Sequence, residues 1–345
     1  MAKYTNTMEM PRKIVMGSEI LDELKGVVDD LGFQRPTIIC DKVTYEIAAS
    51  YLSDLLSCPV IFATHADYSE VEKIVDELPE GTDVIVGVGG GTIIDLAKLS
   101  SRLRSIPFIS VPTAASHDGI ASSRASIKNR DEKTSIQALP PVAVVADTHI
   151  ISQAPYRFLA AGYADLISNY TAVKDWELAH RLKGEYFSEY SHQLSLLSAK
   201  LMIKNADIIK EGNERAARKV LKGLISSGIA MSIAGSSRPA SGSEHLFSHA
   251  LDMIAPKPAM HGEQCGVGSI MMMYLHGGKW RSLKKALKTV KAPTNAEELD
   301  IEEDIILKAL TISHTIRDRF TILGSEGLTE DAARNLAIKT GVIKE

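Results

Sequence analysis

Histidines and one aspartate in the second half of the chain could hold a metal ion. His245 and His249 are four residues apart, so a helix would place both imidazoles on one face. His261 follows twelve residues after His249, and Asp165 lies in a small, apolar stretch where a carboxylate is costly to bury unless it binds something. Two imidazoles and a carboxylate with an open fourth position suit a catalytic zinc, although non-haem iron accepts the same groups. Unrelated histidines on a helix would give the same spacing, so the pattern alone leaves both interpretations open.

A glycine triplet in the first half of the chain could bind a diphosphate. The apolar run at residues 84–88 is typical of a strand buried on both faces of a parallel sheet, and it leads directly into the glycines at 89–91. Thr92 and Asp95 have the spacing of a capping pair for a helix that follows at once. The bare backbone N–H groups of such a turn let a diphosphate approach closely, whereas a simple connecting turn would contain the same glycines.

An acid near the start of the chain could contact the ribose of the same dinucleotide. Asp41 ends the strand predicted over residues 36–41, at the edge where a carboxylate could accept a hydrogen bond from a ribose hydroxyl. It could instead be the N-cap of a helix starting near Val43. In the familiar dinucleotide-binding fingerprint the acid follows the glycines, whereas Asp41 precedes them. We therefore expect a variant of that fold.

The elements that position these groups differ between the two halves of the chain. Strands are predicted at residues 13–16, 36–41, 59–63, 84–88, 106–111 and 142–146. Helices alternate with them, one capped by Ser18 and another, at 70–78, opened by Ser69 and Glu72. This alternation predicts a doubly wound, Rossmann-like α/β domain with a mainly parallel sheet over residues 1–153.

Helical periodicity dominates the second half of the chain, in which no strand is predicted. Helices are expected at residues 155–181, 187–211, 213–234, 243–254, 262–276, 301–323 and 329–343. The second domain, residues 154–345, is therefore predicted to be all-α and to bind metal and substrate. A nucleotide site at the glycines 89–91 of one half and a metal site in the other half predict a cleft between the domains. In this cleft a metal would assist hydride transfer.

The composition excludes several classes of function. The 345 residues are 45% hydrophobic and 24% charged, and the net charge of -4 gives no reason to expect a nucleic-acid partner. The three cysteines have no CxxC spacing, which argues against a disulfide framework and a zinc ribbon. We expect no membrane insertion and a cytoplasmic protein, because no run of 18 apolar residues and no secretion signal is present. The apolar faces of the helical half favour a homo-oligomer.

The motifs, taken together, resemble a known superfamily. They comprise Gly89-Gly90-Gly91-Thr92-Ile93-Ile94-Asp95 with Lys98, Val111-Pro112-Thr113, Ser116-His117-Asp118-Gly119, Asp165, His245, His249 and His261. In order and spacing they are similar to the glycerol dehydrogenases, iron-containing alcohol dehydrogenases and dehydroquinate synthases, over nearly the whole chain. Within this superfamily, residues 116–122 and 238–245 are most similar to the sn-glycerol-1-phosphate dehydrogenases of archaea.

The resemblance implies a dehydroquinate synthase-like fold and an enzyme that reduces dihydroxyacetone phosphate to sn-glycerol 1-phosphate for archaeal ether phospholipid synthesis. It implies NADH or NADPH as the cofactor and Zn²⁺ held by Asp165, His245 and His261. His249 would then face the substrate, which Asp118 and Asp165 would also contact. The implied cofactor contacts are Gly89, Gly90, Gly91, Thr92, Ile93, Ile94, Asp95, Thr113, Ala114, Ala115, Ser116 and Ser122, together with Asp41.

The implied mechanism is hydride transfer to a carbonyl that zinc polarises as a Lewis acid, with His249 as a member of a proton relay. Arg238 and Lys204 are candidate partners of the substrate phosphate. The sequence does not choose between NADH and NADPH, because Lys42 beside Asp41 could accept a 2′-phosphate. Alternatives are a dehydrogenase of unphosphorylated glycerol, a cyclase like dehydroquinate synthase, and a non-catalytic dinucleotide-binding module.

Overall fold

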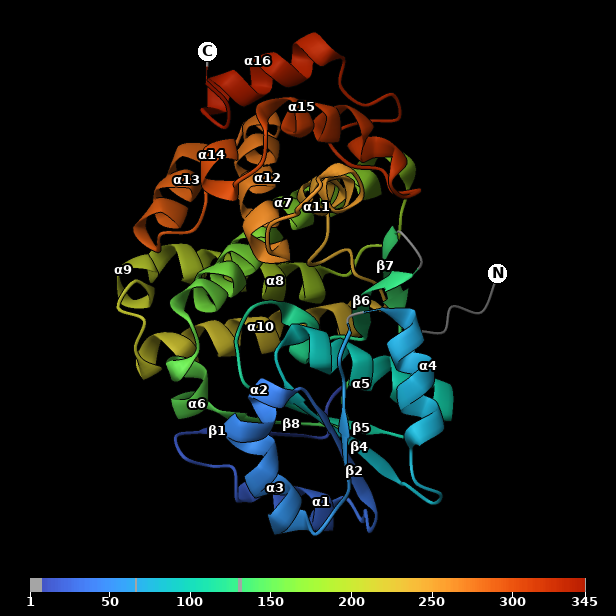
Figure 1. Cartoon of the computed structure of the whole chain (residues 1–345). Helices are drawn as coiled ribbons and strands as arrows, with labels where there is room; N and C mark the ends of the chain where they lie inside the picture. Colours follow the sequence, from blue (N-terminus) through green and yellow to red (C-terminus); the bar gives the residue numbers. More distant parts are fainter. Residues whose placement is uncertain (1–7, 66, 130–131, 345) are drawn as a thin grey trace.

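The computed structural model describes residues 8–65, 67–129 and 132–344, and its first half is built around one parallel sheet (Figure 1). Six strands lie in the order β1-β8-β5-β4-β2-β3. Their bounds are β1 Lys13–Gly17, β2 Pro36–Cys40, β3 Val60–Phe62, β4 Val84–Gly89, β5 Phe108–Pro112 and β8 Ala143–Asp147. Every pairing in this sheet is parallel, and two apolar clusters pack on its faces. The predicted doubly wound sheet is confirmed.

Helices connect the strands of the sheet and cover its faces. They are α1 Glu23–Asp30, α2 Lys42–Thr44, a π-helical turn Tyr45–Ala49, α3 Ser50–Leu56, α4 Tyr68–Glu77, α5 Gly91–Arg104 and α6 Thr148–Gln153. β4 lies between β2 and β5, so the segments that leave these three strands emerge side by side at the carboxyl edge. An edge of this kind is where open α/β sheets bind ligands.

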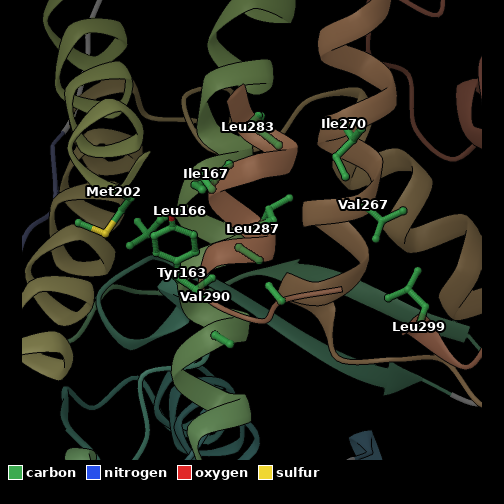
Figure 2. Close-up of a cluster of buried hydrophobic side chains, with 14 of the residues drawn as sticks. Tyr163, Leu166, Ile167, Met202, Val267, Ile270, Leu283, Leu287, Val290 and Leu299 are labelled. Carbon is green, nitrogen blue, oxygen red and sulfur yellow. The ribbon is translucent and has the colours of Figure 1, made fainter. Parts of the chain in front are cut away.

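The second half of the chain is helical, as expected. Its helices are α7 Tyr156–Lys183, α8 Glu189–Lys204, α9 Ala206–Ile209, α10 Glu214–Ala234, α11 Ser243–Ile254, α12 His261–Leu275, α13 Trp280–Thr289, α14 Ala296–Leu299, α15 Glu303–Ile312 and α16 Glu330–Thr340. Figure 2 shows side chains from α7, α8, α12 and α13 meeting in one apolar core. In the described part of the chain, no helix combines the length and the apolar character needed to cross a membrane.

The core of the helical half extends to the sheet. Val144 and Ala146 of β8, and Ala115 after β5, belong to the same apolar cluster as the side chains of α7 and α12. The two halves therefore pack against each other directly. The division at residue 153 stays a prediction.

Several local predictions were wrong at the ends of helices. The helix expected to be capped by Ser18 starts only at Glu23, and α4 starts at Tyr68, where the Asp67 side chain accepts the cap hydrogen bond. Thr92 and Asp95 are not a capping pair, because Gly90 is the N-cap of α5 and Asp95 is buried one turn inside it. The helix expected over 301–323 ends at Ile312. A short antiparallel pair, β6 Arg124–Asn129 and β7 Glu132–Gln137, was not predicted.

A close backbone approach fixes α7 against the loop that follows β5. A Cβ at Gly162 would overlap the carbonyl oxygen of Ala115. Because Gly162 lies one turn before Asp165, this contact sets the depth at which that carboxylate enters the junction of the two halves.

Gly162→Ala is expected to destabilise the protein by about 1–3 kcal/mol, the usual cost of overpacking, because a backbone carbonyl cannot move aside cheaply. The midpoint of urea unfolding measures this effect. Gly26→Ala is the matched control, because a Cβ there has no neighbour within 4 Å and the position lies in exposed α1. Equal midpoints for the two variants would contradict the steric argument.

Candidate active site at the junction of the two halves

A cavity of ≈ 910 Å³ lies between the carboxyl edge of the sheet and the helical half. It is lined on one side by residues that follow β2, β4 and β5, and on the other by residues of α11 and α12. The predicted glycine turn and two of the three predicted metal ligands, His245 and His261, therefore share one cavity, whereas Asp165 is not among its lining residues. The cleft expected from the sequence is present.

The start of α5 presents backbone N–H groups to this cavity. The first intrahelical bond joins the Ile94 N–H to the Gly90 carbonyl at 3.1 Å, so the N–H groups of Gly91, Thr92 and Ile93 precede the helical ladder. A Cβ at Gly91 would overlap the imidazole of His117, which lines the same cavity. Bare glycine backbone at a helix N-terminus suits the diphosphate of a dinucleotide.

The predicted cofactor residues divide into two groups. Those that line the cavity are Asp41, Gly90, Gly91, Thr92, Ile93, Asp95, Thr113, Ala114, Ser116 and Ser122. Gly89, Ile94 and Ala115 are not among the lining residues, and the Ile94 and Ala115 side chains are buried elsewhere in the core. Asp41 is the N-cap of α2, accepting from the Thr44 N–H at 2.8 Å, and it also lines the cavity; its contact with a ribose stays a prediction.

Asp95 and Lys98 form a buried ion pair inside α5, with Nζ 3.3 Å from Oδ1. Lys98 also donates to the backbone carbonyls of Gly119, at 2.7 Å, and Arg124, at 2.5 Å. The other Asp95 oxygen accepts from the Ser126 N–H at 2.8 Å. Burial lowers the pKa of Lys98, opposed by the Asp95 charge. This pair ties the segment after β5 to the helix that begins at the glycine turn.

The predicted metal ligands converge at the other end of the cavity. Asp165 Oδ1 lies 3.7 Å from His245 Nε2 and 3.9 Å from His261 Nε2. Asp165 comes from α7, His245 from α11 and His261 from the first residue of α12. One ligand atom from each of these residues, and from Cys265, lies within 4.8 Å of the others. The donor set fits a transition metal, with nitrogen, oxygen and sulfur around one point.

Hydrogen bonds to Nδ1 of His245 and His261 favour metal binding by the other ring nitrogen, Nε2. His245 Nδ1 lies 2.9 Å from Glu244 Oε1, and His261 Nδ1 lies 3.1 Å from the Ser248 hydroxyl. Each bond leaves Nε2, the atom that faces Asp165, available as a ligand. An outer partner of this kind usually fixes the tautomer of a metal-bound histidine.

Asp118 is held against the same carboxylate. Its N–H donates to Asp165 Oδ2 at 3.1 Å, and its own carboxylate accepts from the Ser227 hydroxyl at 2.9 Å. Burial, together with the nearby Asp118 charge, raises the pKa of Asp165 to about 7. A cation between Asp165 and the two imidazoles would reverse this effect and keep the carboxylate ionised.

His249 lies apart from the three converging groups. Its Nε2 accepts a hydrogen bond from Arg317 Nη2 at 3.0 Å, so this nitrogen carries a lone pair and Nδ1 carries the proton. Burial lowers the pKa of His249 to about 4, and the charge of Arg317 adds to the effect. Its ring still lines the cavity, where a substrate could meet it.

The basic residues predicted to bind phosphate lie elsewhere. Arg238 donates to the Glu185 carboxylate through two nitrogens and to the Phe320 carbonyl at 2.9 Å. Lys204 is exposed at the end of α8. Neither residue lines the cavity, which argues against both candidates.

Two other arginines line the cavity, Arg124 from β6 and Arg317 from the segment after α15. Within the described residues, neither guanidinium forms an ion pair with a carboxylate. Burial lowers the pKa of Arg317 to about 10, and the positive charge of Arg124 acts in the same direction. Cations gathered without a carboxylate form a site for an anion. No spacing motif in the sequence identifies them.

The comparisons with known proteins agree with this site. A family model described as iron-containing alcohol dehydrogenase matches residues 15–155. The glycerol-1-phosphate dehydrogenase (NAD(P)+) of Thermococcus sibiricus is 55% identical over 350 residues, covering 99% of this chain and 100% of the relative. That of Methanosarcina acetivorans is 56% identical over 344 residues, covering 97% and 96%.

The chain belongs to the glycerol-1-phosphate dehydrogenase family. Solved structures support the fold. A glycerol dehydrogenase from Schizosaccharomyces pombe superposes with a TM-score of 0.80 at 21% identity, covering 99% of this chain and 95% of that one. A probable glycerol dehydrogenase from Sinorhizobium meliloti gives 0.81 at 20% identity, covering 97% and 98%.

Membership of the glycerol-1-phosphate dehydrogenase family makes this protein an oxidoreductase that uses NAD(P), and it confirms the resemblance given by the motifs. The sequence analysis missed Arg124 and Arg317, which lie far apart in the chain. It also missed Cys265, although this residue follows His261 by one helical turn and therefore shares its face.

His261→Ala is expected to abolish metal retention while NAD(P)H binding persists, because the imidazole belongs to the converging cluster and not to the glycine turn. Metal content after dialysis and the quenching of protein fluorescence by NADH measure the two properties. His180→Ala, at an exposed position in α7, is the control. A purified His261→Ala protein that kept one metal per chain and normal turnover would refute the ligand assignment.

Proposed function

We propose that the protein reduces dihydroxyacetone phosphate to sn-glycerol 1-phosphate with NADH or NADPH and a bound zinc ion. The observation that carries this proposal is the position of Arg124 and Arg317 in the cavity that His245 and His261 also line, with Asp165 in contact with both imidazoles. A phosphorylated carbonyl compound is a substrate that needs an anion site and a carbonyl-polarising centre within one small cavity.

The cofactor would lie with its diphosphate at the start of α5 and its nicotinamide toward the metal ligands. Residues 90–93 supply the backbone N–H groups for the diphosphate. The other predicted cofactor residues of the cavity line it between this turn and the metal ligands. Asp41 lies where the ribose of the adenosine would be, at the carboxyl edge of β2. The carboxylate favours hydroxyls over a 2′-phosphate, although Lys42 follows it directly.

Bound zinc would supply Lewis-acid polarisation of the substrate carbonyl. The chain itself orients the substrate: Arg124 and Arg317 bind the phosphate, while Asp118, Asp165 and His249 surround the reacting end. The lone pair of His249 Nε2 accepts from Arg317, and it would be free to hold a hydroxyl hydrogen in the proton relay once Arg317 turns to the substrate phosphate. The cofactor would supply the hydride, and the relative positions of the two halves would select the face attacked.

A second candidate is the oxidation of unphosphorylated glycerol, which would need the same cofactor and metal. The two arginines in the cavity argue against it, because a neutral polyol leaves their charge uncompensated. Under the proposed function the product feeds ether phospholipid synthesis, and we infer a cytoplasmic homo-oligomer. A non-catalytic dinucleotide-binding module would have no use for the ligand cluster.

The deciding experiment is a steady-state assay of dihydroxyacetone phosphate and dihydroxyacetone with each cofactor, followed by identification of the product enantiomer. We expect turnover of the phosphorylated substrate, formation of sn-glycerol 1-phosphate and loss of activity with a chelator that zinc restores. Preferential turnover of dihydroxyacetone would favour the polyol dehydrogenase instead. Absence of turnover in the metal-loaded protein would favour the binding module.

Arg317→Ala is expected to lower kcat/KM for dihydroxyacetone phosphate by about 10- to 100-fold relative to dihydroxyacetone, because it removes a charged hydrogen bond worth about 1.5–3 kcal/mol. The ratio of the two kcat/KM values is the measurement, since it cancels effects on His249 that both substrates share. Arg317→Lys should recover part of the loss.

Arg281→Ala, on α13 and outside the cavity, is the control and should leave this ratio unchanged. If Arg317→Ala reduced both substrates equally, the phosphate assignment would be wrong.

A further inference from the structure

A cysteine lies beside the three ligands assigned so far. Cys265 is fully buried in α12, one helical turn after His261. Its Sγ lies 3.6 Å from His261 Nε2, and it belongs to the group of four ligand atoms that lie within 4.8 Å of one another. The thiol therefore shares the point on which Asp165, His245 and His261 converge.

The separation of these atoms matches coordination to one ion. In a tetrahedral site with Zn–S of about 2.3 Å and Zn–N of about 2.0–2.1 Å, sulfur and nitrogen are about 3.6 Å apart. The distance from Cys265 Sγ to His261 Nε2 has this value, and since Sγ also lies 4.0 Å from Nδ1, beside the ring, coordination requires the Cys265 side chain to turn toward the ion. Oxygen and nitrogen ligands of such a site are about 3.4 Å apart. The distances from Asp165 Oδ1 to His245 and His261, 3.7 and 3.9 Å, are only slightly longer.

The other buried cysteine offers a contrast. Cys40 lies at the end of β2 within an apolar cluster on one face of the sheet, where a thiol behaves as a small hydrophobic side chain. Cys265 faces imidazole nitrogen and carboxylate oxygen instead. Its position is that of a ligand and not of core filling.

We propose that Cys265 is a fourth protein ligand of the metal in the substrate-free protein. The proposal rests on the metal site of the proposed function. It adds the identity of the ligand that occupies the fourth position before the substrate binds. Metal binding releases the thiol proton to solvent and forms a metal–sulfur bond. A sulfur donor favours zinc over iron, a choice that two imidazoles and a carboxylate leave open.

A catalytic zinc normally keeps its fourth position for water or substrate. A sulfur ligand in that position makes the thiolate and the substrate oxygen competitors for the ion. The site would therefore be closed at rest, with all four donors supplied by the chain. Substrate would open it by replacing the sulfur.

The test replaces the native metal with Co²⁺ in the full-length protein, in the absence of substrate. A thiolate ligand gives an intense near-ultraviolet sulfur-to-cobalt charge-transfer band. We expect this band in the unmutated protein and in Cys58→Ser, whose sulfur lies near β3, and its loss in Cys265→Ser. Zinc should also leave Cys265→Ser at least about 10-fold faster in the presence of a chelator.

X-ray absorption of the zinc-loaded unmutated protein provides a test that needs no variant. The expected result is a sulfur neighbour at about 2.3 Å from zinc. One bound metal per chain with only nitrogen and oxygen neighbours, or a charge-transfer band that persists in Cys265→Ser, would overturn the proposal and leave the proposed function intact. A protein that binds no metal would overturn both.

Discussion

One buried negative charge determines how this structure is organised. The Asp165 carboxylate lies at the junction of the two halves, where burial and the nearby Asp118 charge work against its ionisation. Its direct neighbours are one backbone N–H and two imidazoles, which is little compensation for a buried carboxylate. The site becomes electrostatically balanced when a cation joins it. The convergence of α7, α11 and α12 serves that requirement.

A second buried carboxylate, ten residues further along α7, shows how the fold treats a charge that is satisfied by hydrogen bonds within the chain. Asp175 accepts hydrogen bonds from the Ser243 N–H and hydroxyl, the His276 imidazole and the Ile322 N–H. All these partners are supplied by the chain. Asp175 thereby ties the start of α11, the end of α12 and the segment near Arg317 to one helix. Asp175 is satisfied and structural, whereas Asp165 is left for a ligand.

Features that depend on local chemistry and periodicity could be predicted from the sequence. The strand before the glycines was recognisable from its unbroken apolar run. His245, His249 and His261 were candidate ligands by residue type, and only the family resemblance chose His245 and His261 among them. Arg317 and Arg124 could not be predicted, because only the tertiary fold brings β6 beside the segment after α15. The prediction of Asp95 as a helix-capping residue was wrong. The same spacing is compatible with a buried carboxylate that pairs with Lys98.

The exact boundaries of the helices, which depend on capping hydrogen bonds, were less predictable than the presence of the helices. α4 begins at Tyr68 because the Asp67 side chain accepts the capping hydrogen bond. Several neighbouring polar residues could have capped the helix instead. The strands β6 and β7 are short and carry no strong alternation, so no strand was predicted over them. For Asp41 the N-cap interpretation is confirmed, and because the residue also lines the cavity, the cap does not exclude the predicted ribose contact.

The backbone contact between Gly162 and Ala115 has a counterpart one residue earlier on α7, where a Cβ at Gly262 would overlap the Ala161 carbonyl. The first contact joins α7 to the segment after β5, and the second joins α7 to α12 within the helical half. A hinge rotation that separated the halves would have to break the Gly162–Ala115 contact, while α7 and α12 would move together. Entry and exit of small molecules are therefore expected to depend on peripheral segments more than on separation of the two halves.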